Sequence, residues 1–378
     1  MRFLVPRQLL LKNLQTVSAL ATANAAIPII NHVLFQVHDN ILTLTATDLE
    51  STLVINVTLS DSEGEGSLVV PQDIILETLK NLPDVPVAFD INEETFAIEM
   101  SADDTKYQLV GNSSSEFPVK PELTNVGTFT IDAKTLTTAI SKTIGATGTS
   151  DIRPVMTGIF CELHPDHITF VATDAHQLAR YNNMGVKTGM EGSFILPKKP
   201  MQALKSALQS LDGTVTVEFN ESQVSFTIDS MQMISKLIEG KYPNYAAVIP
   251  ANNNNILQIE RASLLQRMKS IAPYTSQATS QIRIKIENDH IKMTAEDIDK
   301  SSKATTTMPC QFENADGIED YEIGFSVKYL LEILNNLDTP EVIFKFAQPT
   351  SAGLIYPLHE TETEEDILML LMPVMLNV

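Results

Sequence analysis

Two short segments hold side chains that could act in catalysis or bind a metal. Asp174 and His176 combine a carboxylate with an imidazole, the groups of general acid and base catalysis in a hydrolase. His164 and His167 could form half of a zinc site. No nucleophile has triad spacing to the first pair, and no further ligands accompany the second. The sequence therefore favours a solvated turn for the two histidines and keeps a β-rich hydrolase only as an alternative function.

Motifs of nucleotide and hydrolase chemistry are missing from the rest of the chain. There is no Walker A sequence, no GxSxG and no HExxH, and the glycine-rich fragment EGEG at 63–66 is too acidic to cradle phosphate. Cys161 and Cys310 lie far apart, as expected of thiols in a reducing cytoplasm. We therefore expect no catalytic residues, no metal and no cofactor.

Composition limits the class of protein further. The chain has 378 residues, 43% of them hydrophobic and 19% charged, which predicts a globular protein of two or three domains. No run approaches the about 18 apolar residues of a membrane span, and Pro6 and Arg7 interrupt any secretory signal. We expect a cytoplasmic protein without a membrane partner. Its net charge of −21 argues, taken alone, against binding nucleic acid.

The secondary-structure elements that would position Asp174 and His176 belong to a pattern that occurs three times along the chain. The segments ILTLTATDLE, ITFVATDAHQLA and IKMTAEDIDK alternate apolar and polar residues like half-buried strands, and each reaches an acid, Asp48, Asp174 or Asp297. Successive acids are about 126 residues apart, which is one third of the chain. The repeat predicts three domains, at 1–125, 127–252 and 253–378, with PANNNN as the clearest linker. Three unrelated β-rich domains are the alternative, which the matched order of elements disfavours.

Each third holds two helical patterns separated by alternating runs. The helices are predicted at 6–18, 71–81, 132–144, 197–210, 260–271 and 326–337, where Pro71 and Pro197 suit helix starts and Ser326 an N-cap. Apolar stripes at helical spacing are Leu10, Leu14 and Val17; Met201, Leu204 and Leu208; and Leu330, Leu334 and Leu337. The runs between them, with Asp-Asn, Asn-Glu or Asn-Asp at the reversals, predict antiparallel hairpins. The expected fold is α+β, with a helix pair inside and antiparallel sheets outside.

Charge is distributed unevenly between these elements. The six helices hold twelve basic and five acidic residues, so their net charge is +7 while the rest of the chain carries −28. If the helices share one side of an assembly, that side is positive within a negative body. Six independently solvated helix faces would explain the same count, and charge alone does not separate the two interpretations.

Five segments together resemble one family: TATDLE at 45–50, FVATDAHQLARY at 170–181, SKLIEGKYPNYAAVIP at 235–250, IGFSVKYLLEIL at 323–334 and LLMPVML at 370–376. Over its whole length the chain resembles the β subunit of bacterial DNA polymerase III, the replicative sliding clamp. The resemblance implies a head-to-tail homodimer whose six domains close a ring, each chain forming half of it. It also implies sequence-independent binding of duplex DNA inside the ring. The polymerase, the clamp loader and other clamp-binding proteins would dock through short linear motifs.

The resemblance assigns site residues to this sequence. The helix cations expected to face DNA are Arg7, Lys12, Lys80, Lys134, Lys142, Lys198, Lys199, Lys205, Arg261, Arg267 and Lys269. The partner-peptide cleft would comprise Met156, Thr173, Ala175, His176, Gln177, Leu178, Pro243, Ala247, Val248, Leu370, Met372, Pro373 and Val374. The dimer interface would involve Tyr107 and Leu109 with Ile271 and Tyr274.

Three positions in the expected cleft depart from the family pattern. Gln177 stands where many relatives have arginine, and Ala175 where many have glycine. The tail continues as Met375-Leu376-Asn377-Val378 instead of ending in a basic residue. Ligand preference in this cleft can therefore differ from that of the relatives.

Overall fold

The structure, a computed structural model, describes residues 1–21, 26–150, 152–287, 289–317, 321–361 and 363–376. They divide into two compact units. Unit 1 comprises Met1–Thr137 and Pro197–Ile238, and unit 2 comprises Thr138–Leu196 and Glu239–Val378. Each unit therefore joins one outer third of the sequence to part of the middle third.

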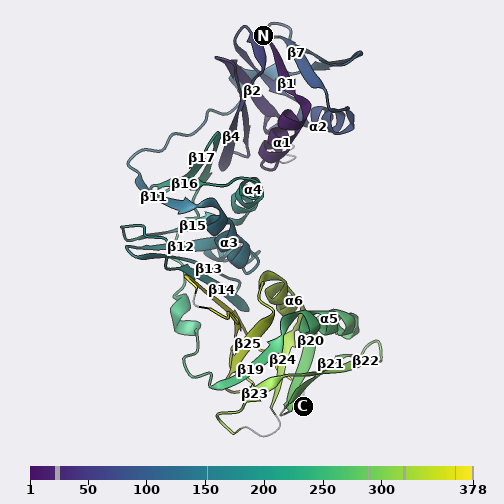
Figure 1. Ribbon diagram of the computed structural model, residues 1–378, viewed down its shortest axis with the longest axis vertical. Helices are drawn as coiled ribbons and strands as arrows, with labels where there is room; N and C mark the ends of the chain where they lie inside the picture. The colour runs from purple at the N-terminus through teal and green to yellow at the C-terminus, as the bar shows by residue number, and fades with distance from the viewer. Residues whose placement is uncertain (22–25, 151, 288, 318–320, 362, 377–378) are drawn as a thin grey trace. The chain divides into compact units, whose positions relative to one another are not determined.

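Unit 1 is built on two antiparallel sheets (Figure 1). The nine-stranded sheet has the order β10 (Asn112–Ser113), β6 (Gly66–Val70), β2 (Val33–His38), β3 (Ile41–Thr47), β4 (Ser51–Thr58), β18 (Met231–Lys236), β17 (Gln223–Ile228), β16 (Thr214–Phe219) and β11 (Gly127–Asp132). The five-stranded sheet has the order β5 (Asp61–Glu63), β1 (Arg2–Pro6), β7 (Pro86–Asn92), β8 (Ala97–Ala102) and β9 (Thr105–Val110). Helices α1 (Arg7–Ser18), α2 (Gln72–Asn81) and α4 (Lys198–Leu208) belong to this unit, and α1 packs on α2.

Unit 2 has the same kind of construction. Its nine-stranded sheet has the order β15 (Gly192–Pro197), β12 (Gly158–His164), β13 (His167–Thr173), β14 (Gln177–Asn183), β27 (Glu365–Leu371), β26 (Gly353–Pro357), β25 (Glu341–Phe346), β19 (Asn255–Glu260) and β23 (Gln311–Glu313). The four-stranded sheet has the order β22 (Ser302–Pro309), β21 (His290–Asp297), β20 (Gln281–Glu287) and β24 (Glu322–Ser326). Helices α5 (Arg261–Ile271) and α6 (Val327–Asn336) pack together, and α3 (Ala133–Ile144) continues into this unit after Thr137.

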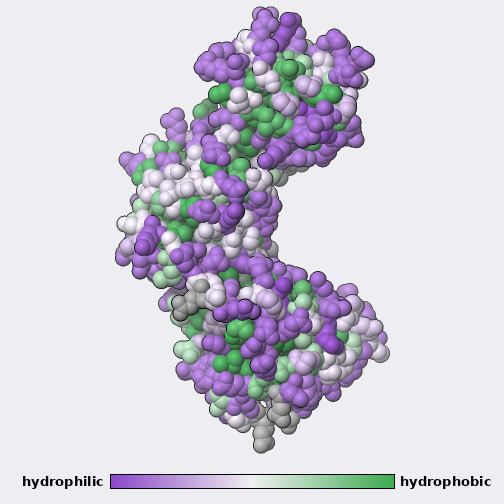
Figure 2. Space-filling view, in the orientation of Figure 1, coloured by the Kyte–Doolittle hydropathy of each residue, from purple (hydrophilic) through white to green (hydrophobic). Residues whose placement is uncertain are grey.

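The helices bury the predicted apolar stripes. Leu10, Leu14 and Val17 of α1 are fully buried, and the predicted stripes of α4 and α6 are buried in the same way. Pro71 and Pro197 occupy the N-cap positions, each directly before its helix, whereas Ser326 caps α6 without a side-chain hydrogen bond. On the face shown in Figure 2, hydrophilic residues cover most of the surface and hydrophobic ones form separate patches. Among the described residues, no helix is long and apolar enough to cross a membrane.

The hairpins confirm that the first and second thirds repeat. Asp39 and Asn40 join β2 to β3 with positive φ values of 48° and 59°, which a type I′ turn requires. Thr43 of β3 faces Asn56 of β4 and donates a hydrogen bond to its Oδ1 at 2.9 Å. The same bond recurs 126 residues later, from Thr169 to Asn182, at 3.2 Å. In the third repeat, Asn288 of the predicted Asn-Asp reversal lies outside the described residues.

Candidate functional site

The turn that follows β13 is held by backbone hydrogen bonds to two side chains. Asp174 Oδ1 accepts bonds from the backbone N–H groups of His176 at 2.8 Å and Gln177 at 2.9 Å. Thr173 Oγ1 donates to the Gln177 carbonyl at 2.6 Å and accepts from the Ala175 N–H at 3.1 Å. The turn after β3 repeats this pattern with Thr47 and Asp48. The Thr-Asp pair of the sequence repeat therefore stabilises a turn in which the next two residues are exposed to solvent.

The C-terminal segment lies beside this turn. Strand β27 pairs with β14 so that Leu371 faces Gln177 and Leu370 faces Leu178. Beyond the strand, the N–H of Met372 donates to the carbonyl of His176 at 2.8 Å. The structure thus brings together the cleft residues predicted from β14, its turn and the chain end. Asn377 and Val378, the last residues of the departing tail, lie outside the described residues.

The linker after β18 is held against the same sheet by two tyrosines. Tyr242 stacks on Phe160 of β12 with ring centroids 4.6 Å apart and 2° between the ring planes. Tyr245, which opens the short 3₁₀ helix Tyr245–Val248, donates a hydrogen bond from its hydroxyl to Glu162. This anchoring orders the segment that carries Pro243, Ala247 and Val248.

Apolar side chains of the predicted cleft remain open to solvent. Val248 is 57% exposed and Met372 43% exposed, and the neighbouring Met375 is 70% exposed. Thr173, Gln177, Leu178 and Leu370 are buried beneath them, and Met156, Pro373 and Val374 are half-buried. Exposed apolar side chains, methionine in particular, are a feature of surfaces that bind apolar ligands.

Tyr329 also belongs to this site, although it was not among the residues predicted from the sequence. Its ring stacks on that of His176 at 6.2 Å, and its hydroxyl donates a hydrogen bond to Asp174. Burial and the Asp174 carboxylate raise the pKa of Tyr329 to about 12, so the hydroxyl stays protonated. Asp174 and His176 are thus occupied by a turn and an aromatic contact, and the structure does not support the hydrolase alternative.

Ala175 occupies a strained conformation, from which a stability prediction follows. Its φ of 77° lies in the left-handed region, which costs a non-glycine residue about 1–2 kcal/mol. Glycine removes this strain, but it also increases the conformational entropy of the unfolded chain, which lowers the free energy of unfolding by about 0.4–1 kcal/mol. We expect Ala175→Gly to raise the free energy of unfolding by about 0.5–1 kcal/mol in chemical denaturation. Ala179→Gly, in the middle of β14, is the control and should destabilise; a loss of stability in Ala175→Gly would contradict the prediction.

The basic residues of unit 1 fall into two groups. Arg7 donates to the carbonyls of Leu79 at 2.7 Å and Lys80 at 3.0 Å, which neutralises the C-terminal end of α2. Lys199 contacts Asp48 Oδ2 at 2.5 Å, and Lys134 contacts Asp212 at 3.0 Å. Among the residues that the structure describes, no ion pair joins an acid to the remaining predicted cations of this unit, Lys12, Lys80, Lys198 and Lys205. Of the cations predicted to face DNA in unit 1, these four are the ones whose charge no described acid neutralises.

The basic residues of unit 2 require one correction. Lys142 is 5% exposed, and its ammonium contacts the Asn336 carbonyl at 2.5 Å and the Asp338 carboxylate. It joins α3 to the end of α6 and is not a surface cation, so the prediction that it faces DNA was wrong. The sequence pattern of α3 placed Lys142 on its polar face, which was expected to be exposed, but the end of α6 covers that part of α3.

Two arginines of α5 are also tied to neighbouring elements. Arg261 donates to the carbonyls of Thr339 and Leu334 at 2.7 and 3.0 Å, as Arg7 does at the end of α2. Arg267 donates to Thr306 of β22 at 3.0 Å. Lys269 is exposed, and among the described residues it forms no ion pair.

The predicted interface residues lie on an edge strand of unit 1 and at the end of a helix of unit 2. Strand β9 carries half-buried Tyr107 and Leu109 and, among the described strands, pairs only with β8. In unit 2, Tyr274 is 42% exposed, but Ile271 is 3% exposed and packs inside its own unit. The prediction that Ile271 contributes an interface contact was therefore wrong, because its helical spacing turns it toward the core with Leu264 and Met268.

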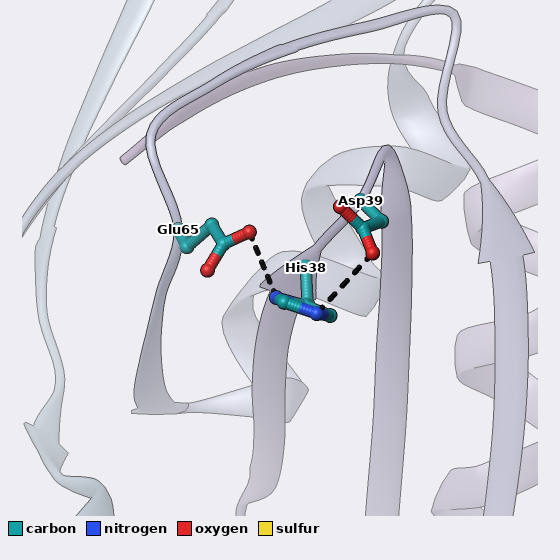
Figure 3. Close-up of side chains that lie close together, drawn as sticks. All are labelled: His38, Asp39 and Glu65. Atoms are coloured by element: carbon teal, nitrogen blue, oxygen red, sulfur yellow. Dashed lines mark ion pairs between the residues drawn. The ribbon is translucent and has the colours of Figure 1, made fainter.

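The two histidines of the predicted turn lie against one another. His164 and His167 stack on one another with centroids 4.1 Å apart, and among the described residues no third ligand joins them. One other cluster, His38, Asp39 and Glu65, is exposed (Figure 3). Its carboxylates bind opposite nitrogens of one imidazole, Glu65 at Nδ1 (2.8 Å) and Asp39 at Nε2 (3.3 Å). The two carboxylates lie on opposite sides of the imidazole ring and do not point toward a shared metal position. This is the geometry of an imidazolium paired with two acids.

We expect His38 to titrate above the pKa ordinary for histidine. Its hydrogen bond with Glu65 and then the charge of Asp39 favour the protonated ring. Because the folded-state pKa is raised, the contribution to stability is present below about pH 6.5 and is lost as the pH rises through the raised value. In an NMR titration, Glu65→Gln should lower the pKa of His38 more than Asp39→Asn does. The opposite order would contradict this arrangement.

Comparisons with known proteins agree along the whole chain. Three family models match: the N-terminal, central and C-terminal domains of the DNA polymerase III beta subunit, at residues 1–121, 130–244 and 246–373. The chain is 28% identical to the beta sliding clamp of Pseudomonas aeruginosa over 97% of both chains, and 26% identical to that of Vibrio cholerae over 100% of both.

Solved structures of beta clamps are similar over their full length. A P. aeruginosa sliding clamp, solved with griselimycin bound, has a TM-score of 0.91 at 26% identity and full coverage of both chains. The DNA polymerase III beta subunit of Thermotoga maritima has a TM-score of 0.90 at 25% identity, also with full coverage. Sequence and fold therefore agree on one family.

Proposed function

Because the chain belongs to the family of DNA polymerase III beta subunits, the bacterial sliding clamps, we propose that two copies close head to tail into a ring around duplex DNA. The family is non-catalytic, and its role is to make a polymerase processive. In the cytoplasm, the ring would hold the replicative polymerase, the clamp loader and other replication and repair proteins on DNA. The domains of the proposed protomer are 1–125, 127–252 and 253–378.

The observation that carries the ring is a strand pairing repeated within the chain. In unit 1, β4 pairs with β18, and in unit 2, β14 pairs with β27, so each outer third is joined to the middle third by one strand pair. Strand β22 is the third-repeat equivalent of β4 and β14, because each of these strands pairs with the strand directly before it: β22 with β21, β4 with β3, and β14 with β13. Strand β9 follows β8 through a turn that β17 and β18 repeat 126 residues later, since Ala102 faces Thr105 and Ile228 faces Met231.

Within this series, β9 and β22 are the two strands that pair on one side only in the described part of the chain, β9 with β8 and β22 with β21. The third pairing of the series would therefore join β9 of one copy to β22 of another, which is a head-to-tail contact that closes after two copies. A pocket of about 260 Å³ beside β9 is lined by Ile74, Glu77, Thr78, Asn81 and Tyr107. Tyr274 of a second copy, whose side chain is 42% exposed, is our proposed occupant.

The helix cations support weak, sequence-independent binding of duplex DNA. Lys12, Lys80, Lys198, Lys205 and Lys269 form no ion pair within the described residues, so their charge is available to phosphate. Attraction that rests on counterion release, without base contacts, lets a closed ring slide. We propose these five as the main DNA-facing cations, with Arg7, Lys134, Lys199, Arg261 and Arg267 adding to the positive potential from their fixed positions.

We propose that the exposed apolar residues at the end of β14 and β27 receive partner peptides. Met372, Pro373, Val374 and Val248 would supply the apolar contacts, and His176 the polar orientation. The other residues assigned to this cleft, Met156, Ala175, Pro243 and Ala247, would border it, above the buried Thr173, Gln177, Leu178 and Leu370.

Retention on DNA of different topology tests the ring. We expect protein loaded on closed circular DNA to stay bound in high salt, because a closed ring is linked to the circle. Linearising the DNA after loading should release it. Gel filtration of the complexes before and after cleavage measures the difference, and equal retention on both forms would contradict the proposal.

A further inference from the structure

Unit 1 contains a pocket of about 610 Å³ that the function above does not use. Its floor is one face of β2, β3, β4 and β18, where Leu34, Gln36 and Val54 lie, and its wall is the first linker, residues 114–120. The pocket is separate from the proposed peptide-binding residues, which all belong to unit 2.

The repeat identifies the equivalent surface in unit 2. Leu34 faces Thr45 in unit 1, and Phe160 faces Val171 in unit 2, each 126 residues later. By the same spacing, Gln36 corresponds to Glu162. The linkers correspond as well: Phe117-Pro118 matches Tyr242-Pro243, and both aromatic rings are 6% exposed.

In unit 2 this surface is filled by the chain itself. The Tyr245 ring meets the Phe160 ring edge-on, with centroids 6.3 Å apart, and its hydroxyl donates to Glu162. In unit 1, the counterpart of Tyr245 is Lys120 and that of Phe160 is Leu34, so two rings are replaced by aliphatic side chains. Lys120 is exposed and Val119 is 92% exposed, so the linker does not fill the space itself.

We propose that this pocket binds a tyrosine side chain from a linear segment of a partner protein, in the place that Tyr245 occupies in unit 2. Leu34 and Val54 offer apolar contact to the ring, and the Gln36 side-chain carbonyl accepts a hydrogen bond from the tyrosine hydroxyl, as Glu162 does from Tyr245 in unit 2. Lys120 and Asp229 are the charged residues in the lining and have opposite signs, which suits a neutral ligand. Tyrosine combines an apolar ring with a polar end, as the lining requires.

Neutral tripeptides provide the probe. The methyl signals of Leu34, Val54 and Val119 are followed by NMR during titration with acetyl-Gly-Tyr-Gly-amide, and with matched phenylalanine and leucine peptides. We expect saturable shifts at these methyls, with the tyrosine peptide binding about three- to tenfold more tightly than the leucine peptide. In Gln36→Glu, the preference for tyrosine over phenylalanine should increase, because a carboxylate accepts the stronger hydrogen bond.

Filling the pocket from within is the decisive variant. Lys120→Tyr restores the residue of the second linker, and a ring that occupies the pocket nine-tenths of the time lowers the apparent affinity about tenfold. Lys187→Tyr makes the same change at an exposed position of unit 2 and should leave binding unchanged. Unaltered binding in Lys120→Tyr, equal binding of the leucine peptide, or shifts confined to unit 2 would each overturn the proposal. If the same methyl signals shift when the protein concentration is raised without peptide, the pocket binds a second copy of the chain, and this result would also overturn the proposal.

Discussion

Deleting residues 372–378 is expected to abolish binding of the replicative polymerase while the dimer stays intact. The deletion removes the exposed Met372 and Met375 together with Pro373 and Val374, the apolar group beside the His176 turn. A few buried apolar anchors usually dominate such an interface, so we expect at least about a 100-fold loss of affinity. The proposed dimer contacts on β9 and β22 lie outside the deleted segment.

Surface plasmon resonance with the polymerase catalytic subunit measures this affinity, and sedimentation measures the dimer. The tail also binds its own unit, since the Val374 N–H donates to the Gly324 carbonyl at 2.8 Å. The double variant Met372→Ala and Val374→Ala keeps these backbone bonds and should lose most of the affinity as well. A matched change outside the site, Met184→Ala, removes a methionine that is 49% exposed and should have no effect. Full affinity after the deletion would contradict the assignment of the cleft.

Leu109→Asp is expected to convert the dimer to monomer and to remove retention on circular DNA. Leu109 lies on the same side of β9 as Tyr107, which lines the pocket proposed for Tyr274 of the second copy. A carboxylate buried there without a partner should weaken the dimer about 100-fold or more. Each junction of the proposed ring joins β9 of one copy to β22 of the other. A substitution on β9 therefore affects both junctions.

The neighbouring residue provides the control for this change. Gln108 points to the other side of β9 and is exposed, so Gln108→Asp adds the same charge without entering the pocket. Sedimentation equilibrium should find a dimer for Gln108→Asp and a monomer for Leu109→Asp, with native stability in both. A dimer of unchanged strength in Leu109→Asp would place the interface elsewhere.

Local patterns predicted much of the fold correctly. The helix starts after Pro71 and Pro197, the buried face of α1 and the Asp39-Asn40 turn all depend on residues close in sequence. The Thr-Asp pairs at 47–48 and 173–174 recur in the sequence repeat, and in the structure their side chains accept the hydrogen bonds that hold the two turns. These features follow from backbone propensity and periodicity, which act over a few residues.

Contacts between distant segments explain the error at Lys142 and the omission of Tyr329, whereas the error at Ile271 went against the local helical spacing of its own helix. Lys142 has the spacing of an exposed helix residue, but Asn336 and Asp338 cover it from the third repeat. Tyr329 joins the His176 site from a helix that begins 150 residues after that turn. The pocket lined by Phe117 also brings together Lys120 and Leu34, which are more than 80 residues apart and correspond to two ring-bearing residues in unit 2. No local periodicity records such pairs.

The sequence by itself determined the threefold repeat, the helices with their buried stripes, the hairpins and the family. It did so because each of these depends on local spacing or on patterns recurring along the chain. Only the tertiary structure decided which of the predicted cations are ion-paired, which residues surround the turn at Asp174, and that β9 and β22 each lie at the edge of a sheet. The physical reason is that burial and strand pairing are properties of the assembled sheet and depend on what covers a residue from elsewhere in the chain.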